Sequence, residues 1–334
     1  MNFMLRRALI AVAVGLFSTS ALAQQVVNVS YNVAEGSSWH QGAERFAQLV
    51  DEYSDGEYVV RLHPNASLAG GSDRVELEMT QSGAIQFLIK STTWMTGLDD
   101  RYQALGMPWL FPNHDVANAV LDGPAGDALY ADMRESDLVG LAWGVNGFRQ
   151  VTNSERAIRT PEDLEGLRIR VPGIELYLSI FDELGASPTT MNFAEVFTAL
   201  ETGAVDGQEN PMSLISSSRF VDVQEHMTIW NYSYDALAFV TGTPFWDSLD
   251  DADQSMFERA AEEAMDFQRE VVAQEDIDLK TELADRGMTV TVLSDSEIAI
   301  FQELLQPVYD EYKAELGADF IELFEDGVQS AQMN

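Results

Sequence analysis

The chain has 334 residues with 19 Lys and Arg against 55 Asp and Glu, so its formal net charge is −36, and it contains no cysteine. Such a charge repels nucleic-acid phosphates and anionic lipid headgroups, which argues against binding to nucleic acid or to a membrane surface. Without cysteine the chain has no disulfide, thiolate nucleophile, iron–sulfur cluster or lipid-modified N-terminal cysteine. The length and the 46% of hydrophobic residues predict about two domains with buried cores.

The first 23 residues have the pattern of a secretory signal peptide. Arg6 and Arg7 precede an apolar run over 8–17, and Ala21-Leu22-Ala23 is the small-x-small pattern that signal peptidases cleave. A membrane anchor is the alternative, but spanning a bilayer takes about 20 apolar residues. We therefore expect cleavage after Ala23 and a mature protein in the periplasm.

Strand and helix patterns alternate through the first part of the mature chain. The expected strands are 26–31, 58–62 and 84–89, and the expected helices are 38–53 and 72–83. Repeated strand–helix–strand units favour parallel strands covered by helices, and hence an α/β sheet. Another buried strand is expected over 138–143, and the stretch 144–147 after it is a candidate crossing point between two lobes.

The second half repeats this pattern. The expected strands are 167–171, 204–206, 227–232 and 288–293, and the expected helices are a short one after Thr160, then 174–184, 192–203, 248–286 and two more at the end. Asn192 and Glu195 have the spacing of a capping box. The acidic run over 247–253 fits a helix N-terminus, which favours carboxylates, better than a calcium site. The natural arrangement is two α/β lobes with a cleft between them.

Catalytic motifs are missing from the sequence. It has no H-E-x-x-H, G-x-S-x-G, Walker or G-x-G-x-x-G pattern, which leaves metalloprotease, serine hydrolase and nucleotide-binding functions without support. The four histidines fall in different elements without the spacing of metal ligands. We therefore predict no catalytic residue, no metal and no cofactor.

Two arginines point to an anion site. In the strand that ends at Pro172, Arg170 is nearest the carboxyl end, where strands of an open α/β sheet face the ligand crevice, whereas Arg168 is expected to reach solvent. Arg149 follows the suspected crossing point and can project into the same gap. A guanidinium group matches a carboxylate with two parallel hydrogen bonds, so two arginines at one cleft indicate an anion-binding site.

The surrounding motifs resemble a known family. The stretches that carry the resemblance are 166–172, 185–189, 192–203 and 204–211, the last ending in Asp-Gly-Gln-Glu-Asn-Pro, with His63 to Leu68 in the first lobe. They closely resemble the periplasmic substrate-binding proteins of tripartite ATP-independent periplasmic (TRAP) transporters, the DctP family, over essentially the whole mature chain.

The resemblance implies roles for individual residues. Arg170 falls on the family's arginine that clamps the ligand carboxylate, and Arg149 on a second arginine that often assists it. Asn210 falls on an asparagine that usually reaches the ligand, and Phe193 on the aromatic residue before the Ala-Glu-Val helix. Further candidate contacts are Tyr232 and Tyr234 in the segment that crosses back to the first lobe and, from strand ends alone, Glu35, Lys90, Ser91 and Trp94.

The resemblance also implies a fold and a function. The fold is the type II periplasmic binding protein fold, with two α/β lobes around a ligand cleft and a long helix linking them. Lobe 1 is expected over 24–146 and 236–275, and lobe 2 over 147–235 and 276–334. A monomer would deliver a C4-dicarboxylate, 2-oxo acid or sugar acid to a small DctQ-type and a large DctM-type membrane subunit. The alternatives are a ligand-sensing accessory of the same fold, an exported enzyme with a carboxylate pair, and a structural or adhesive protein.

Overall fold

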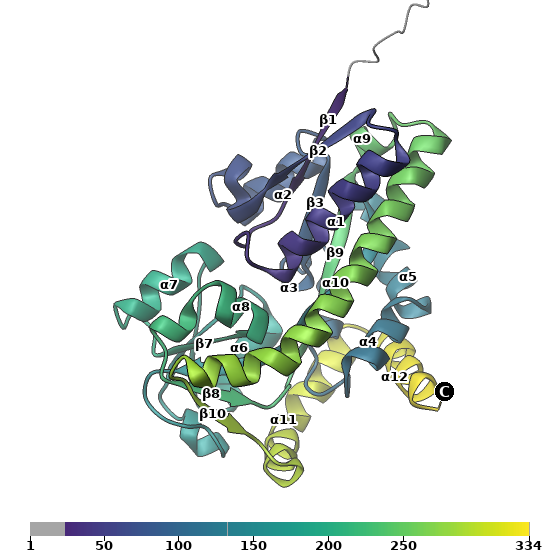
Figure 1. Cartoon of the computed structure of the whole chain (residues 1–334). Helices are drawn as coiled ribbons and strands as arrows, with labels where there is room; N and C mark the ends of the chain where they lie inside the picture. The colour runs from purple at the N-terminus through teal and green to yellow at the C-terminus, as the bar shows by residue number, and fades with distance from the viewer. Residues whose placement is uncertain (1–23, 132, 334) are drawn as a thin grey trace, which may run out of the picture.

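The computed structural model describes residues 24–131 and 133–333. The predicted signal peptide lies outside these residues. Figure 1 shows an upper lobe, formed by the N-terminal strands and their helices, above a lower lobe that contains the middle of the chain. The long helix α10 (Asp251–Asp285) runs along both lobes. No helix in the described ranges combines the length and the apolar character that crossing a membrane requires.

Ten strands of the described residues form one continuous sheet, in the order β2-β1-β3-β9-β4-β7-β5-β6, with β8 beside β4 and β10 beside β8. Their bounds are β1 (Gln25–Ser30), β2 (Tyr58–His63), β3 (Phe87–Ser91), β4 (Leu138–Asn153), β5 (Arg168–Val171), β6 (Ser187–Thr190), β7 (Gly207–Pro211), β8 (His226–Ile229), β9 (Tyr234–Gly242) and β10 (Thr289–Val292). Parallel pairs such as β1 with β2 and β5 with β6 confirm the predicted α/β sheet.

Strand β4 joins the two parts of the sheet. It pairs antiparallel with β9 from Leu138 to Phe148, and from Arg149 to Asn153 it pairs with β7 instead. The change of partner follows Gly147, whose φ of +126° is one that residues with a side chain rarely adopt. The crossing point predicted at 144–147 therefore lies where β4 passes from the upper to the lower lobe.

Helices cover the sheet of each lobe. The α-helices are α1 (Ser38–Tyr53), α2 (Asp73–Gln81), α3 (Thr92–Met95), α4 (His114–Leu121), α5 (Pro124–Ala131), α6 (Glu175–Glu183), α7 (Phe193–Glu201), α8 (Met212–Ser217), α9 (Thr243–Trp246), α10, α11 (Asp295–Glu315) and α12 (Ala318–Gln332). Short 3₁₀ helices span Pro64–Ala69, Asp100–Gly106, Met133–Ser136, Pro161–Leu164 and Phe220–Asp222. Helix α10 packs against α1 of the upper lobe, β4, and α8 of the lower lobe, while α12 packs on α4 and α5. The two lobes are thus held together by one long helix as well as by β4 and β9.

The start of α10 confirms the prediction that the acidic run over 247–253 marks a helix N-terminus. Asp250 is the N-cap, and its carboxylate accepts hydrogen bonds from the backbone N–H groups of Ala252 and Asp253. A carboxylate at this position satisfies N–H groups that have no partner within the helix. The acidic run therefore belongs to a helix start.

Three local predictions are wrong. Residues 204–206 are not a strand, because the N–H groups of Ala204 and Val205 donate to the carbonyl of Ala199 and close the end of α7. The strand expected over 227–232 ends at Ile229, before the left-handed Asn231 (φ +49°) turns the chain toward β9. At α7 no capping box forms, since the Asn192 side chain makes no capping hydrogen bond.

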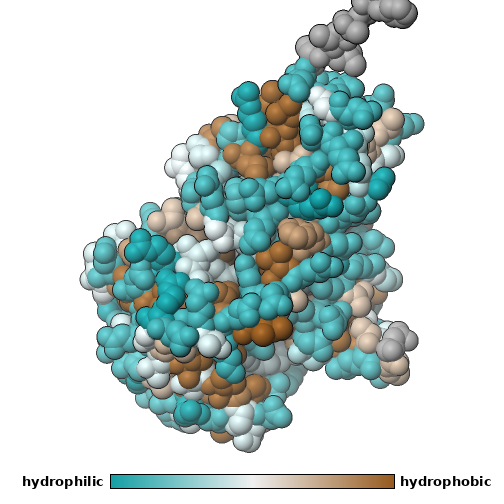
Figure 2. Space-filling view, viewed as in Figure 1, coloured by the Kyte–Doolittle hydropathy of each residue, from teal (hydrophilic) through white to brown (hydrophobic). Residues whose placement is uncertain are grey.

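The carboxylates lie mostly on the exterior. Figure 2 shows hydrophilic residues over most of one face, with apolar residues in small groups between them. Among the described Asp and Glu residues, the buried ones are Asp73, Glu76, Glu209 and Asp235. The negative net charge is therefore mainly a property of the surface.

Candidate ligand-binding site

All the buried charges of the described residues gather where the two lobes meet. They are Asp73, Glu76, Lys90, Arg149, Arg170, Glu209 and Asp235. A charge removed from water destabilises the fold unless partners or a ligand compensate it. Seven charges in one place therefore mark a functional region and not a part of the apolar cores.

A cavity lies within this region. Its volume is about 20 Å³, which admits little more than one water molecule. Both lobes line it: the residues are Asn32, Val33, Trp39, Ser91, Thr93, Trp94, Asn146, Arg149, Arg170, Pro172, Phe193, Asn210, Leu214 and Asp235. The lobes are thus closed over the cavity in this structure.

Arg170 is a buried cation without a carboxylate partner. Arg168, two residues earlier on β5, is exposed, as the sequence predicted, and it binds Asp206, whereas Arg170 is 1% exposed. Its Nε and Nη2 donate to the carbonyl of Met191 at 3.2 and 2.7 Å, and within the described chain no carboxylate forms an ion pair with it. Burial, together with the charge of Arg149, lowers the pKa of Arg170 to about 10, although Glu209 acts in the opposite direction.

Arg149 is neutralised by the protein. Its Nη2 donates to Glu209 Oε1 at 2.8 Å, its Nε binds the other oxygen of the same carboxylate, and its Nη1 donates to Asp235 at 2.7 Å. Burial alone would lower the pKa of Arg149, but Glu209, Tyr177 and Asp235 raise it above its usual value. The two predicted arginines therefore line one cavity with different electrostatic roles.

Asp235 ties the crossing strands to the upper lobe. Besides Arg149, its carboxylate accepts from the hydroxyl of Ser91 at 2.7 Å and from the amide nitrogen of Asn146 at 2.6 Å. Trp39 in turn donates to Asn146 Oδ1 at 2.9 Å. These groups come from β3, β4, β9 and α1, so a hydrogen-bonded network joins the crossing strands to the upper lobe.

A second buried cluster lies in the upper lobe. Lys90 Nζ binds Glu76 at 2.7 Å and also binds Asp73, whose carboxylate accepts from the amide nitrogen of the cavity residue Asn32 at 2.6 Å. The charge of Asp73 also acts on Arg170, in the direction that raises its pKa. This cluster therefore borders the cavity, although Lys90 itself does not line it.

The structure brings together six of the ten predicted contacts: Arg170, Arg149, Asn210, Phe193, Ser91 and Trp94 line the cavity. The other four do not. Tyr232 is buried and donates to Glu209 at 2.8 Å, Tyr234 contacts Asn118, Lys90 lies in the upper cluster, and Glu35 is exposed. Tyr232 thus lies behind the cavity lining and positions Glu209, the partner of Arg149.

Sequence reasoning missed several cavity residues. Asn32, Trp39, Asn146 and Asp235 line the cavity, but they stand far apart in the sequence and belong to no motif that indicates a ligand. The nearest signal was the stretch 144–147, which contains Asn146, and the segment 230–235, which ends at Asp235. Neither pattern showed which side chain turns inward.

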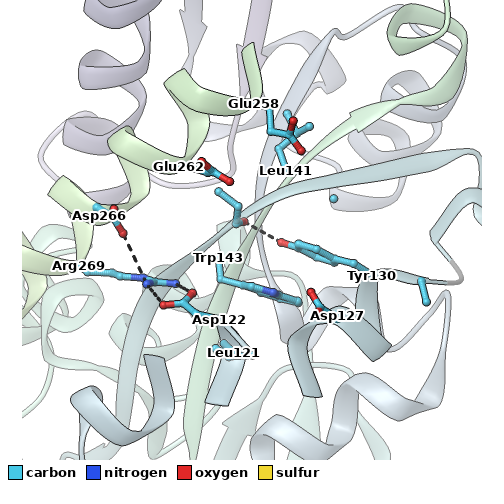
Figure 3. A pocket seen from close by; sticks show the side chains of 13 residues that line it. Leu121, Asp122, Asp127, Tyr130, Leu141, Trp143, Glu258, Glu262, Asp266 and Arg269 are labelled. Atoms are coloured by element: carbon cyan, nitrogen blue, oxygen red, sulfur yellow. Dashed lines mark hydrogen bonds and ion pairs between the residues drawn. The ribbon is translucent and has the colours of Figure 1, made fainter. Parts of the chain in front are cut away.

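A much larger groove is unsuited to an anion. It has a volume of about 620 Å³ and lies between α10, β4 and the α4–α5 region (Figure 3). Carboxylates surround it: Asp122, Asp127, Glu258, Glu262 and Asp266. Its lining arginine, Arg269, already binds both oxygens of Asp122 at 2.7 Å, and Figure 3 shows this pair beside the stacked rings of Tyr130 and Trp143. An anion would meet repulsion here, so the small cavity is the candidate site.

Comparison with known proteins agrees with this fold. The model of bacterial extracellular solute-binding protein family 7, DctP, matches residues 29–315. The C4-dicarboxylate-binding periplasmic protein DctP of Rhodobacter capsulatus is 31% identical over 95% of this chain and 97% of its own.

Two solved structures have the same architecture. The sugar acid binding protein DctPAm from Advenella mimigardefordensis, in complex with galactonate, superposes with a TM-score of 0.89 at 32% identity, over 93% of this chain and 99% of its own. A TRAP periplasmic solute-binding protein from Shewanella oneidensis with bound succinate gives a TM-score of 0.87 at 31% identity, over 91% of this chain and 99% of its own.

Proposed function

The chain belongs to bacterial extracellular solute-binding protein family 7, DctP, and on this premise we propose that it captures a small organic acid for a TRAP transporter. The protein holds the acid in the cavity between its lobes and releases it, chemically unchanged, to the membrane subunits. The ligand class is the one that the sequence suggested: a C4-dicarboxylate, a 2-oxo acid or a sugar acid.

The observation that carries this proposal is the uncompensated charge of Arg170. A guanidinium that is 1% exposed and binds only a backbone carbonyl among the described residues needs an anion to complete its interactions. A ligand carboxylate can form charge-assisted hydrogen bonds with the guanidinium edge that Met191 leaves free. The ring of Phe193, whose centroid lies 6.0 Å from the guanidinium carbon, offers an apolar wall to the carbon skeleton.

Ligand entry requires the cavity to widen. A cavity of about 20 Å³ holds no organic acid, so ligand entry must separate the lobes or shift the side chains around it. The crossing strands β4 and β9 near Gly147 and Asp235 supply the hinge. The domain boundaries predicted at residues 146/147, 235/236 and 275/276 fall near these crossings and within α10, and they remain part of the proposal.

Delivery follows from the family. We assign the partners to a small DctQ-type and a large DctM-type membrane subunit, which would recognise the closed form. Removal of residues 1–23 as a signal peptide would place a monomeric mature protein in the periplasm. The chain needs no catalytic group for this role, because its task is binding and release.

A thermal-shift screen of organic and sugar acids tests the function. A ligand that binds only the folded state raises apparent stability by RT ln(1 + [L]/Kd), about 2.7 kcal/mol at a hundredfold excess over Kd. We expect at least one carboxylate to raise the melting temperature, and the bound acid to be recovered unchanged by mass spectrometry. A full panel of small acids without any shift contradicts organic-acid binding, and recovery of an altered compound contradicts a transport role.

A further inference from the structure

The charges around the cavity leave room for one negative group and not for two. Arg149 binds Glu209 and Asp235, and Lys90 binds Asp73 and Glu76, so each of these cations is already outnumbered by its carboxylate partners. In the part of the chain that the structure describes, Arg170 is the buried cation that has no ion-pair partner.

The buried charges can be counted directly. Four carboxylates against three cations leave the region with one formal negative charge before any ligand binds. One ligand carboxylate at Arg170 forms a close pair with a free cation. A second carboxylate would find no free cation among the described buried residues, and it would lie in a closed cavity lined by Asp235. Like charges at short range in a poorly solvated site repel each other strongly.

One residue of the cavity lining has a buried hydrogen-bond acceptor that lacks a donor. Asn32 lines the cavity, and its Oδ1 is buried without a hydrogen-bond partner in the described structure. Its amide orientation is fixed, because the Asp73 carboxylate only accepts and must therefore face the Asn32 nitrogen, 2.6 Å away. A ligand hydroxyl can donate to Oδ1, whereas an ionised carboxylate cannot.

We infer that the ligand is a hydroxylated monocarboxylate, with its carboxylate at Arg170 and a hydroxyl at Asn32, and not a dicarboxylate. This inference rests on the proposed function and narrows its ligand class. The free charge at one end of the cavity and the free acceptor in the upper lobe are separate observations, and both favour a ligand with one carboxylate and at least one hydroxyl group.

Matched acids test the inference with the unaltered mature protein. Calorimetry at pH 7.5 compares galactonate with galactarate and erythronate with meso-tartrate, because each pair differs in a terminal hydroxymethyl group replaced by a second carboxylate. Both carboxylates of the diacids are ionised at this pH. In the pair that binds better, we expect the monoanion to bind at least about 30-fold more tightly than its diacid, as like-charge repulsion in a closed site implies.

A side-chain variant separates the hydroxyl from the charge. In Asn32→Ala the affinity for the preferred monoanion should fall about tenfold, because its hydroxyl loses the acceptor Oδ1. Asn28→Ala is the matched control, because Asn28 lies four residues earlier, in β1, but binds Gln86 and His63 and does not line the cavity. If the Asn32 variant fails to fold, the comparison of the matched acids with the unaltered protein still tests the inference.

The possible outcomes are distinct. A diacid that binds as tightly as its monoanion, or an Asn32→Ala variant that binds the preferred monoanion as tightly as the unaltered protein does, overturns the inference while organic-acid binding stands. Absence of binding by every acid of either kind in the wider screen overturns the proposed function and this inference with it.

Discussion

Replacing Arg170 with methionine should weaken ligand binding and stabilise the ligand-free fold. Methionine keeps much of the length of the side chain and removes the buried charge. The two effects have opposite signs because the guanidinium destabilises the empty protein and binds the ligand. A residue that served only the fold would lower both stability and binding when replaced.

The pKa of Arg170 gives the size of the stability effect. Its fall from the ordinary 12.5 to about 10 corresponds to a cost of about 3 kcal/mol for the charged form, at 1.36 kcal/mol for each pKa unit. The variant also deprives the Met191 carbonyl of its donors, which costs about 1–2 kcal/mol. We therefore expect a net gain of about 1–2 kcal/mol in the unfolding free energy of the ligand-free protein.

The binding effect is larger. Loss of one partner of a buried charge pair costs about 2–5 kcal/mol, which is a loss of affinity of roughly 30-fold to a few thousandfold. Calorimetry with the acid found by the screen measures the affinity, and urea unfolding without ligand measures the stability. Arg168→Met is the matched control: Arg168 lies two residues away on the same strand but is exposed, so its replacement should change affinity less than twofold.

Two results would refute this reasoning. A loss of affinity below threefold in Arg170→Met shows that the guanidinium does not hold the ligand. A ligand-free variant less stable by 2 kcal/mol or more shows that the protein itself compensates the charge of Arg170.

Three further predictions follow from the other charges. Arg149→Met should lower the unfolding free energy by about 3–5 kcal/mol, the opposite of Arg170→Met, because it leaves two buried carboxylates unpaired; a stability equal to that of the unaltered protein in urea unfolding contradicts the pairing. Burial and the neighbouring Asp276 raise the pKa of Glu275 from 4.5 to about 7. Since the unfolded chain ionises this carboxyl above about 4.5 and the folded protein only near 7, its contribution should reduce stability as pH rises across that window. Glu275→Gln should therefore gain about 2 kcal/mol of unfolding free energy relative to the unaltered protein between pH 5 and pH 8, and a stability difference between the two proteins that is the same at all pH values contradicts this effect. Because the acidic exterior repels itself, the melting temperature should rise between low salt and about 1 M salt, and a constant value contradicts surface repulsion.

The sequence by itself determined the class of protein and singled out Arg170. Arg168 and Arg170 are two residues apart and share one face of their strand, so position along the strand distinguished them: Arg170 is nearer the carboxyl end, where strands of an open α/β sheet face the ligand crevice. Helices with clear caps, such as α1 and α10, were predicted close to their observed bounds, because their signals lie within a few residues of each other. The motifs at 166–172 and 206–211 were enough to indicate the family and the carboxylate chemistry.

Only the tertiary structure decided which charges are free. Arg149 and Arg170 looked alike in the sequence, yet Glu209 and Asp235, 60 and 86 residues further along the chain, neutralise the first and not the second. Asp73 stands in the first turn of a helix, where a solvated carboxylate is common, but here it is buried and bound by Lys90 from β3 and by Asn32 from the segment after β1. Local patterns report which face a side chain takes on its own element. They cannot report the partners that folding brings to it, and at this cavity those partners decide which charge is left for the ligand.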